Sequence, residues 1–269
     1  EALTLRVAGL VDDQIAWSGA VEGLTIRPGK NTRTRVFMTR VEAISCSRRP
    51  LHVARALGAT VVLDDGRVLI AGGIERVRTG ACGDGCDVML AGASVDVFDP
   101  RTGGIYPVAR LHTPRALATA TLLADGRVLV VGGARRLTTG AVSGFPFAIE
   151  EQDAVDSFEV YLPDEDLWIE KPLPQGRVLH TATALEDGRV LVAGGGTGLH
   201  VDQALDTALL FDPSAESVGD FVSAQGRMAT PRLGHTATLM FNGKVLIVGG
   251  ALITTVAPVE EFSLSGEGG

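Results

Sequence analysis

One stretch recurs along this chain and restricts its fold more than any other feature. It reads Leu-Leu-Ala-Asp-Gly-Arg-Val-Leu-Val-Val-Gly-Gly at residues 122–133, and close copies occupy residues 63–73, 185–195 and 240–250. Asp-Gly or Asn-Gly between two apolar runs predicts a tight hairpin, because both central residues of a type I′ turn need positive φ. We therefore expect each copy to form a two-residue hairpin that ends in a pair of glycines.

The copies belong to longer repeats with a fixed internal spacing. An arginine stands eleven residues before every turn glycine, and the turn glycines are 55 to 62 residues apart. We call these residues the lead arginines: Arg55, Arg115, Arg177 and Arg232. In the second repeat the pattern predicts strands at 116–123, 127–131, 157–161 and 167–170. Four strands in a repeat of this length indicate an all-β fold, a β-propeller of four-stranded antiparallel blades.

The residue types within each repeat agree with packing between blades. Val128-Leu-Val-Val131 is apolar without alternation, as expected for a strand covered on both faces. The double glycines that follow the second strands permit unusual φ values and close backbone approach. They are 72–73, 132–133, 194–195 and 249–250. The third strands carry an aromatic residue, and large side chains follow in the fourth, where we expect burial. The two sets are Phe98, Tyr161, Phe211 and Phe262, and then Tyr106, Trp168 and Phe221.

These features together resemble the kelch repeat. The resemblance rests on paired glycines after an apolar strand, on an aromatic residue followed by Asp-Pro, and on the Arg-x-x-His of Arg177–His180 and Arg232–His235. It covers about residues 50–265 in four recognisable repeats. It implies a propeller like the central domain of galactose oxidase. Kelch propellers mostly bind proteins and a minority are copper radical enzymes, so the fold does not choose the function.

The two ends of the chain depart from the repeat. Residues 1–40 alternate apolar and polar side chains and predict a separate N-terminal β segment, either a sandwich remnant or a degenerate blade. The propeller is then expected to span residues 41–269. The final repeat has no strand after Phe262, and residues near 41–47 are expected to supply that strand and close the ring.

Composition excludes several partners. A net charge of −8 without a basic run argues against nucleic acid, because phosphate neutralisation needs a basic stripe. No apolar run approaches the roughly 20 residues of a transmembrane helix. A secreted, periplasmic or cell-surface location is preferred, and the oligomeric state stays open.

Metal and cofactor chemistry is not favoured by the sequence. Cys82-Gly-Asp-Gly-Cys86 is compatible with a disulfide, free thiols or a metal, but the second Cys pair of a zinc site is missing; Cys46 is the third cysteine. The histidines lack H-x-H or H-E-x-x-H spacing. A copper radical site needs tyrosine ligands, whereas Tyr106 and Tyr161 occupy blade positions. We therefore expect no cofactor and no metal.

Long insertions mark one side of the propeller as the binding side. The loops after the double glycines are long and dissimilar, at 74–92, 134–156, 196–206 and 251–258, whereas the loops of the other side are short. We call the long-loop side the insertion side. Arginines there could hold carboxylates bidentately. The candidate binding residues are Arg76, Arg78, Arg135, Arg136, His200 and the lead arginines. For the lead arginines, recurrence in every repeat favours structural bonds to backbone carbonyls near the centre of the ring.

The sequence thus predicts a non-catalytic binding module that presents the insertion side to a protein or glycan. The alternative is a carbohydrate-acting enzyme, a lyase, isomerase or oxidase, with its site at the channel mouth. That alternative needs a pocket holding at least two titratable groups with displaced pKa values.

Overall fold

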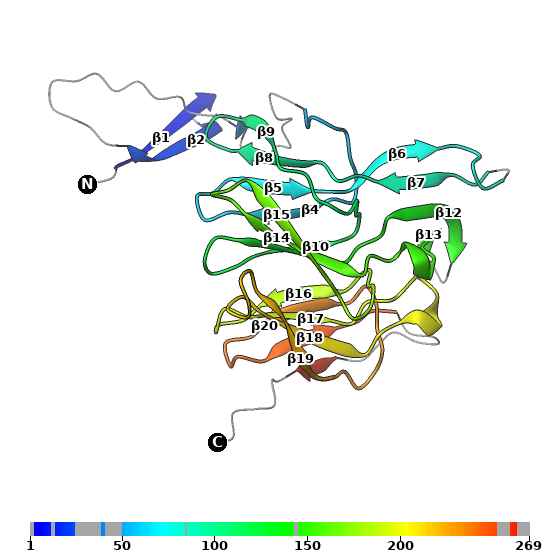
Figure 1. Ribbon diagram of the computed structural model, residues 1–269. Helices are drawn as coiled ribbons and strands as arrows, with labels where there is room; N and C mark the ends of the chain where they lie inside the picture. The colour runs from blue at the N-terminus through cyan, green and yellow to red at the C-terminus, as the bar shows by residue number, and fades with distance from the viewer. Residues whose placement is uncertain are drawn as a thin grey trace, which may run out of the picture.

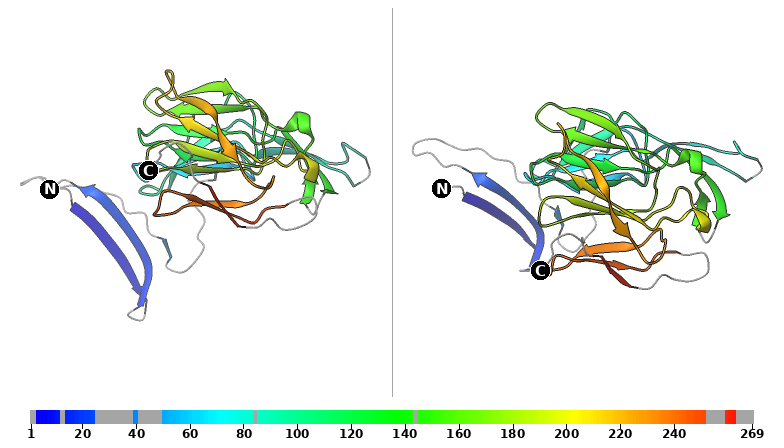
Figure 2. Two further views of the ribbon diagram at one scale, coloured as in Figure 1. Left: turned by 90° about the horizontal axis from the view of Figure 1, so that it is seen from below. Right: turned by 60° about the horizontal axis from the view of Figure 1, so that its bottom comes forward.

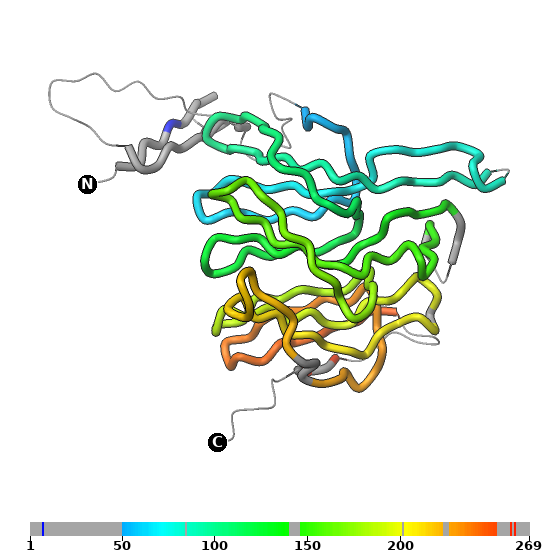
Figure 3. Tube along the Cα trace, viewed as in Figure 1, coloured from blue at the N-terminus to red at the C-terminus, as the bar shows by residue number. Residues whose placement is uncertain are grey.

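The structure is a computed structural model that describes residues 3–11, 14–24, 39–40, 50–83, 85–142, 145–251 and 259–262. Strands dominate these ranges, with two single-turn 3₁₀ helices, η1 (Glu151–Asp153) and η2 (Val201–Gln203). Figure 1 shows the main sheets stacked in chain order, and the tube in Figure 3 follows the same path.

The stacked sheets are the predicted blades. The first holds β4 (Ala59–Val62), β5 (Val68–Ala71), β8 (Val95–Asp99) and β9 (Gly104–Val108). The second holds β10 (Thr119–Leu122), β11 (Val128–Val131), β14 (Ser157–Leu162) and β15 (Leu167–Pro172). The third holds β16 (Thr181–Ala184), β17 (Val190–Ala193), β18 (Thr207–Asp212) and β19 (Asp220–Arg227). The fourth holds, in the described residues, β20 (Thr236–Leu239), β21 (Val245–Val248) and β22 (Glu260–Phe262). Neighbouring strands within each blade are antiparallel, and the first strands of consecutive blades lie side by side.

The core lies between blades rather than within any one of them. Leu69 of the first blade belongs to one buried cluster with Val130 and Trp168 of the second, and the ring of Phe158 of the second contacts that of Phe211 of the third. Every residue of β11 and β17 is buried, as the unbroken apolar runs predicted. Each such side chain contributes about 1.5–3 kcal/mol of burial free energy. Blade stacking therefore supplies most of the hydrophobic stabilisation.

The hairpin turns differ from the type I′ prediction. At Leu63–Arg67 the N–H of Gly66 donates to the Leu63 carbonyl at 2.9 Å, and the N–H of Leu63 donates to the Arg67 carbonyl at 2.7 Å. Only Gly66 has positive φ (82°), so Asp65 is right-handed and the loop is one residue longer than predicted. Asp65 instead accepts a hydrogen bond from the Arg67 N–H at 3.0 Å. A type I turn closed by a left-handed glycine is the next most common hairpin after the two-residue turns.

The double glycines join consecutive blades. The N–H of Gly73 donates to the carbonyl of Arg115 in the next blade at 2.8 Å, and Gly133 donates in the same way to Arg177 at 2.9 Å. A Cβ atom on the preceding glycine would collide with that same carbonyl: Gly132 would place one 2.4 Å from the Arg177 oxygen. A Cβ atom on Gly249, in the fourth blade, would meet no atom of the described residues within 4 Å. In the first three blades, the first glycine of the pair is therefore required both by its φ and by the next blade.

We expect Gly132→Ala to reduce the free energy of unfolding more than Gly249→Ala. Both glycines have positive φ, 58° and 72°, so both substitutions introduce about 1 kcal/mol of backbone strain. Only Gly132→Ala adds a clash with a neighbouring backbone, worth about 1–3 kcal/mol more. Urea unfolding of the two variants measures the difference. Equal losses would show that the blade junction tolerates a methyl group.

One predicted aromatic position is wrong. Tyr106 is 49% exposed, whereas Trp168, its assumed equivalent, is 2% exposed. The strand register explains the difference. Trp168 pairs with the third-strand aromatic Tyr161, and the residue that pairs with Phe98 is Ile105, which is buried. Ile105 therefore fills the position in the first blade, and Tyr106 points to the other face of β9.

The insertions of the first two blades form a sheet of their own, which we call the accessory sheet. Its order is β13 (Phe145–Ala148), β12 (Arg136–Val142), β7 (Val88–Ala91) and β6 (Ile74–Arg78), all antiparallel. The sequence predicted only loops here. Both views of Figure 2 show the β6–β7 hairpin extending beyond the blades.

The N-terminal residues form a further antiparallel sheet. It consists of β1 (Leu3–Val11), β2 (Gln14–Leu24) and β3 (Thr39–Arg40) in that order. The ring-closing strand predicted near 41–47 and Cys46 lie outside the described residues. Within the described ranges, no helix has the length and apolar character that crossing a membrane requires.

Candidate functional site

The lead arginines hold the blades internally. Each guanidinium donates to the carbonyl of the first glycine of its own blade: Arg115 to Gly132 at 3.1 Å and Arg177 to Gly194 at 3.2 Å, for example. The side chain of Arg55 is 2% exposed, and Arg115, Arg177 and Arg232 are at most 1% exposed. A partner cannot reach these groups, so the structure supports the structural role over the binding role for all four.

In the first and second blades, a buried carboxylate on the third strand completes this arrangement. Arg115 Nη2 donates to Glu159 at 2.7 Å, and the backbone N–H groups of His112 and Thr113 donate to the same carboxylate at 2.8 and 3.1 Å. Asp96 binds Arg55 in the first blade. Sequence reasoning missed both acids, although each stands two residues before the third-strand aromatic. That spacing was the available signal.

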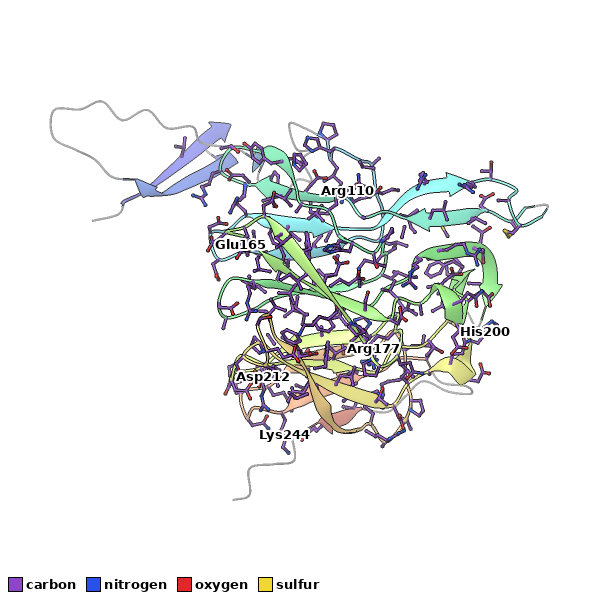
Figure 4. All side chains as sticks on the ribbon, in the orientation of Figure 1. Arg110, Glu165, Arg177, His200, Asp212 and Lys244 are labelled. Atoms are coloured by element: carbon purple, nitrogen blue, oxygen red, sulfur yellow. A yellow bond between two sulfur atoms is a disulfide. The ribbon has the colours of Figure 1, made fainter. Side chains whose placement is uncertain are left out.

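The third blade lacks its carboxylate. Leu209 is the third-blade equivalent of Glu159, because it pairs with Val192 as Glu159 pairs with Val130. An apolar residue therefore faces Arg177. Pro174 stands three residues before Arg177, as His112 does before Arg115, but proline has no N–H to donate to a carboxylate. Burial lowers the pKa of Arg177 to about 10. Figure 4 shows Arg177 inside the stack of blades, distant from His200 at the rim.

The histidines also bind within the scaffold. His180 Nε2 lies 2.9 Å from Thr119 Oγ1 of the preceding blade, and His235 Nε2 lies 3.0 Å from Thr181 Oγ1 in the same way. Burial, followed by the charge of Arg177, lowers the pKa of His180 to about 3. His52 and His112 are half exposed, and each contacts the carboxylate of its own blade unit. The described residues contain no group of three or more metal-ligating side chains.

The insertion-side arginines divide into two pairs. Arg135 donates to the Ala154 carbonyl at 3.3 Å and to Asp156 at 3.2 Å, and Arg136 binds Asp153 at 2.8 Å. These two arginines therefore tie their own insertion to the blade. Arg76 and Arg78 are exposed on β6, and among the described residues neither has an acidic partner. Exposed His200 directly precedes η2, and its N–H donates to the side-chain oxygen of Gln203.

A small polar pocket lies on the insertion side between the second and third blades. Its volume is about 180 Å³, below the roughly 300 Å³ at which drug-sized ligands begin to fit. Its lining residues are Arg135, Glu151, Gln152, Ala154, Asp156, Gln175, Gly176 and Thr197. Among the described residues, the titratable groups with large pKa displacements lie in the blade interior instead: Tyr161, Arg177 and His180. The pocket therefore suits recognition of one polar side chain better than acid–base catalysis.

The tip of the β6–β7 hairpin is closed by a disulfide. Cys82 and Cys86 are joined, and their Cα atoms are 5.2 Å apart. The tip is also tied to β12, because the Asp87 N–H donates to Thr139 Oγ1 at 2.7 Å and the Thr139 N–H donates to the Asp87 carbonyl at 2.9 Å. Of the three possibilities for this motif, the structure contains the disulfide.

Comparison with known proteins agrees with this architecture. No family model matches the chain. The F-box/kelch-repeat protein At1g51550 of Arabidopsis thaliana is 30% identical over 145 residues, which are 51% of this chain and 28% of that protein. The solved structure of YjhT superimposes with a TM-score of 0.54 at 12% identity, covering 92% of this chain and 69% of that one. The fold is a β-propeller, and about half of the chain is similar in sequence to a kelch-repeat protein. The predicted four-stranded antiparallel blade is confirmed, whereas the number of repeats in the ring stays a prediction.

Proposed function

We propose that this propeller is a protein-binding module that holds its partner on the insertion side. The observation that carries the proposal is the accessory sheet, in which the insertions of two blades combine into an ordered surface outside the blades. Loops that vary on a packed scaffold are where binding residues concentrate. The matched kelch-repeat protein supports the same class of function.

The charge on this surface favours an acidic protein partner. Arg76 and Arg78 are exposed and have no acidic partner in the described part of the chain, whose full sequence carries a net charge of −8. Guanidinium groups bind carboxylates bidentately and are enriched at protein interfaces. Exposed Val77 stands between them, which favours a peptide over a sugar. The polar pocket would accept one side chain of the same partner.

We expect Arg76→Ala/Arg78→Ala to reduce partner capture about tenfold, because two carboxylate contacts are lost. The protein is immobilised and the bound proteins are quantified by mass spectrometry. Arg67→Ala/Arg101→Ala is the matched control, since it removes two exposed arginines from the short-loop side. Circular dichroism checks that both variants fold. Equal capture by both variants would contradict the assignment of the insertion side, and no capture by the unmodified protein would contradict the binding function.

A further inference from the structure

The outer strand of the accessory sheet has a free edge. β6 is the last strand in the order β13-β12-β7-β6, and after the bridge between Ile74 and Ala56 no described strand pairs with its outer side. Residues 76–79 are exposed. An exposed strand edge presents unpaired N–H and C=O groups that can pair with another chain. This edge is therefore a template for an added strand.

The two faces of β6 differ in chemistry. Arg76 pairs with Leu90 and Arg78 with Val88, so both guanidinium side chains stand on one face of the sheet. Val77 stands on the other face beside Met89, continuing an apolar surface toward buried Leu137. Val77 is 56% exposed at the border of that surface. A strand added beside β6 would extend both faces at once.

The hairpin that carries this edge is held in place before any partner arrives. The disulfide closes its tip, and Asp87 and Thr139 bind the base of the tip to β12. The Gly80 N–H donates to Asp87 Oδ1 at 3.1 Å. A preorganised edge lowers the ordering entropy that binding has to overcome.

We propose that β6 accepts an extended acidic peptide as a fifth strand of the accessory sheet. Acidic residues of the peptide stand opposite Arg76 and Arg78, and an apolar residue stands opposite Val77. Backbone hydrogen bonds supply affinity in this mode and alternate side chains supply specificity. The recognised pattern is therefore acidic–apolar–acidic. This inference rests on the proposed protein-binding function and names its partner.

The arginines have a competing role that the experiment must separate. Charged side chains on an edge strand commonly prevent edge-to-edge aggregation. In that case their removal would cause self-association of this protein without changing its affinity for an acidic peptide. The two roles thus predict different measurements on the same variants.

The test uses a fluorescein-labelled peptide of alternating glutamate and valine, seven residues long, with its anisotropy measured against the full chain. We expect saturable binding that weakens about tenfold or more in Arg76→Glu/Arg78→Glu, because each reversal replaces attraction with repulsion. Arg110→Glu, a charge reversal at an exposed site outside the accessory sheet, leaves the affinity unchanged. A peptide with proline at its central position keeps the charge but loses a ladder N–H, and it binds at least tenfold more weakly.

Three results would overturn the proposal. They are absence of binding by the glutamate-valine peptide, equal affinity for a lysine-valine peptide, and self-association of the arginine variants with peptide affinity retained. None of these results contradicts the proposed protein-binding function. If the immobilised protein still captures partners that depend on the insertion side, the binding function holds and only the strand-addition mode fails.

Discussion

Arg115→Met is expected to lower the free energy of unfolding by about 3–5 kcal/mol, whereas the equivalent Arg177→Met lowers it by only about 1–2 kcal/mol. The side chains are matched in position and burial, and both donate to the first glycine of their own blade. Arg115 makes additional hydrogen bonds to Ser157, but the larger difference between the two arginines is the buried carboxylate. Removing Arg115 leaves Glu159 fully buried without its cation, while removing Arg177 leaves no buried carboxylate behind.

The physical reason for this asymmetry is desolvation. In a buried ion pair, the attraction between the charges offsets the free energy of removing both from water. A buried charge without its partner has no such attraction and is strongly destabilising. Glu159 would keep the backbone N–H groups of His112 and Thr113, which limits the loss. In the third blade, no described carboxylate pairs with Arg177, so the bonds lost among the described residues are those to Gly194 and Thr207.

A double-mutant cycle tests the explanation. Arg115→Met/Glu159→Leu reproduces in the second blade the residue type that the third blade carries at Leu209. We expect the double variant to be more stable than Arg115→Met, with a coupling free energy of about 2 kcal/mol or more from urea unfolding. Additive losses, or equal losses in Arg115→Met and Arg177→Met, would show that the ion pair contributes nothing specific.

The sequence was sufficient for the repeated part of the fold because each repeated residue has a local reason. The double glycines, the apolar second strands and the lead arginines recur at fixed spacing, and the structure places each as a blade residue. The predicted turn type was wrong because Asp65 keeps a right-handed conformation, in which its side chain accepts a hydrogen bond from the Arg67 N–H. The residue pattern alone did not reveal this side-chain hydrogen bond.

The site was less predictable because it depends on contacts between repeats. The accessory sheet pairs β7 of one insertion with β12 of another, and no local pattern specifies that pairing. The sequence predicted Arg135 and Arg136 as binding residues, but in the folded chain each forms an ion pair with an aspartate of its own insertion. Arg76 and Arg78, on the edge strand, stay accessible for the opposite reason: no described strand pairs with the outer side of β6 beyond Ile74.

Acidification is expected to destabilise the protein through His180. Its pKa is about 6.5 when unfolded and about 3 in the folded chain, so the unfolded state binds the extra proton as the pH falls. The contribution of neutral His180 is complete above about pH 6.5 and is lost progressively between about 6.5 and 3. Between pH 7.5 and pH 5 the loss is about 2 kcal/mol.

His180→Ala isolates this contribution from every other titrating group. Alanine is the residue at the equivalent position of the second blade, Ala118, so the blade scaffold has a precedent for the change. The stability difference between the unmodified protein and His180→Ala should shrink by about 2 kcal/mol when the pH is lowered from 7.5 to 5. The charge of Arg177 contributes to the low pKa of His180, so Arg177→Met should raise that pKa. The stability of the protein should then depend less on pH. A difference that stays constant across this pH range would mean that His180 accepts its proton without unfolding the blade junction, and that the pairing of His180 with Thr119 does not require the neutral ring.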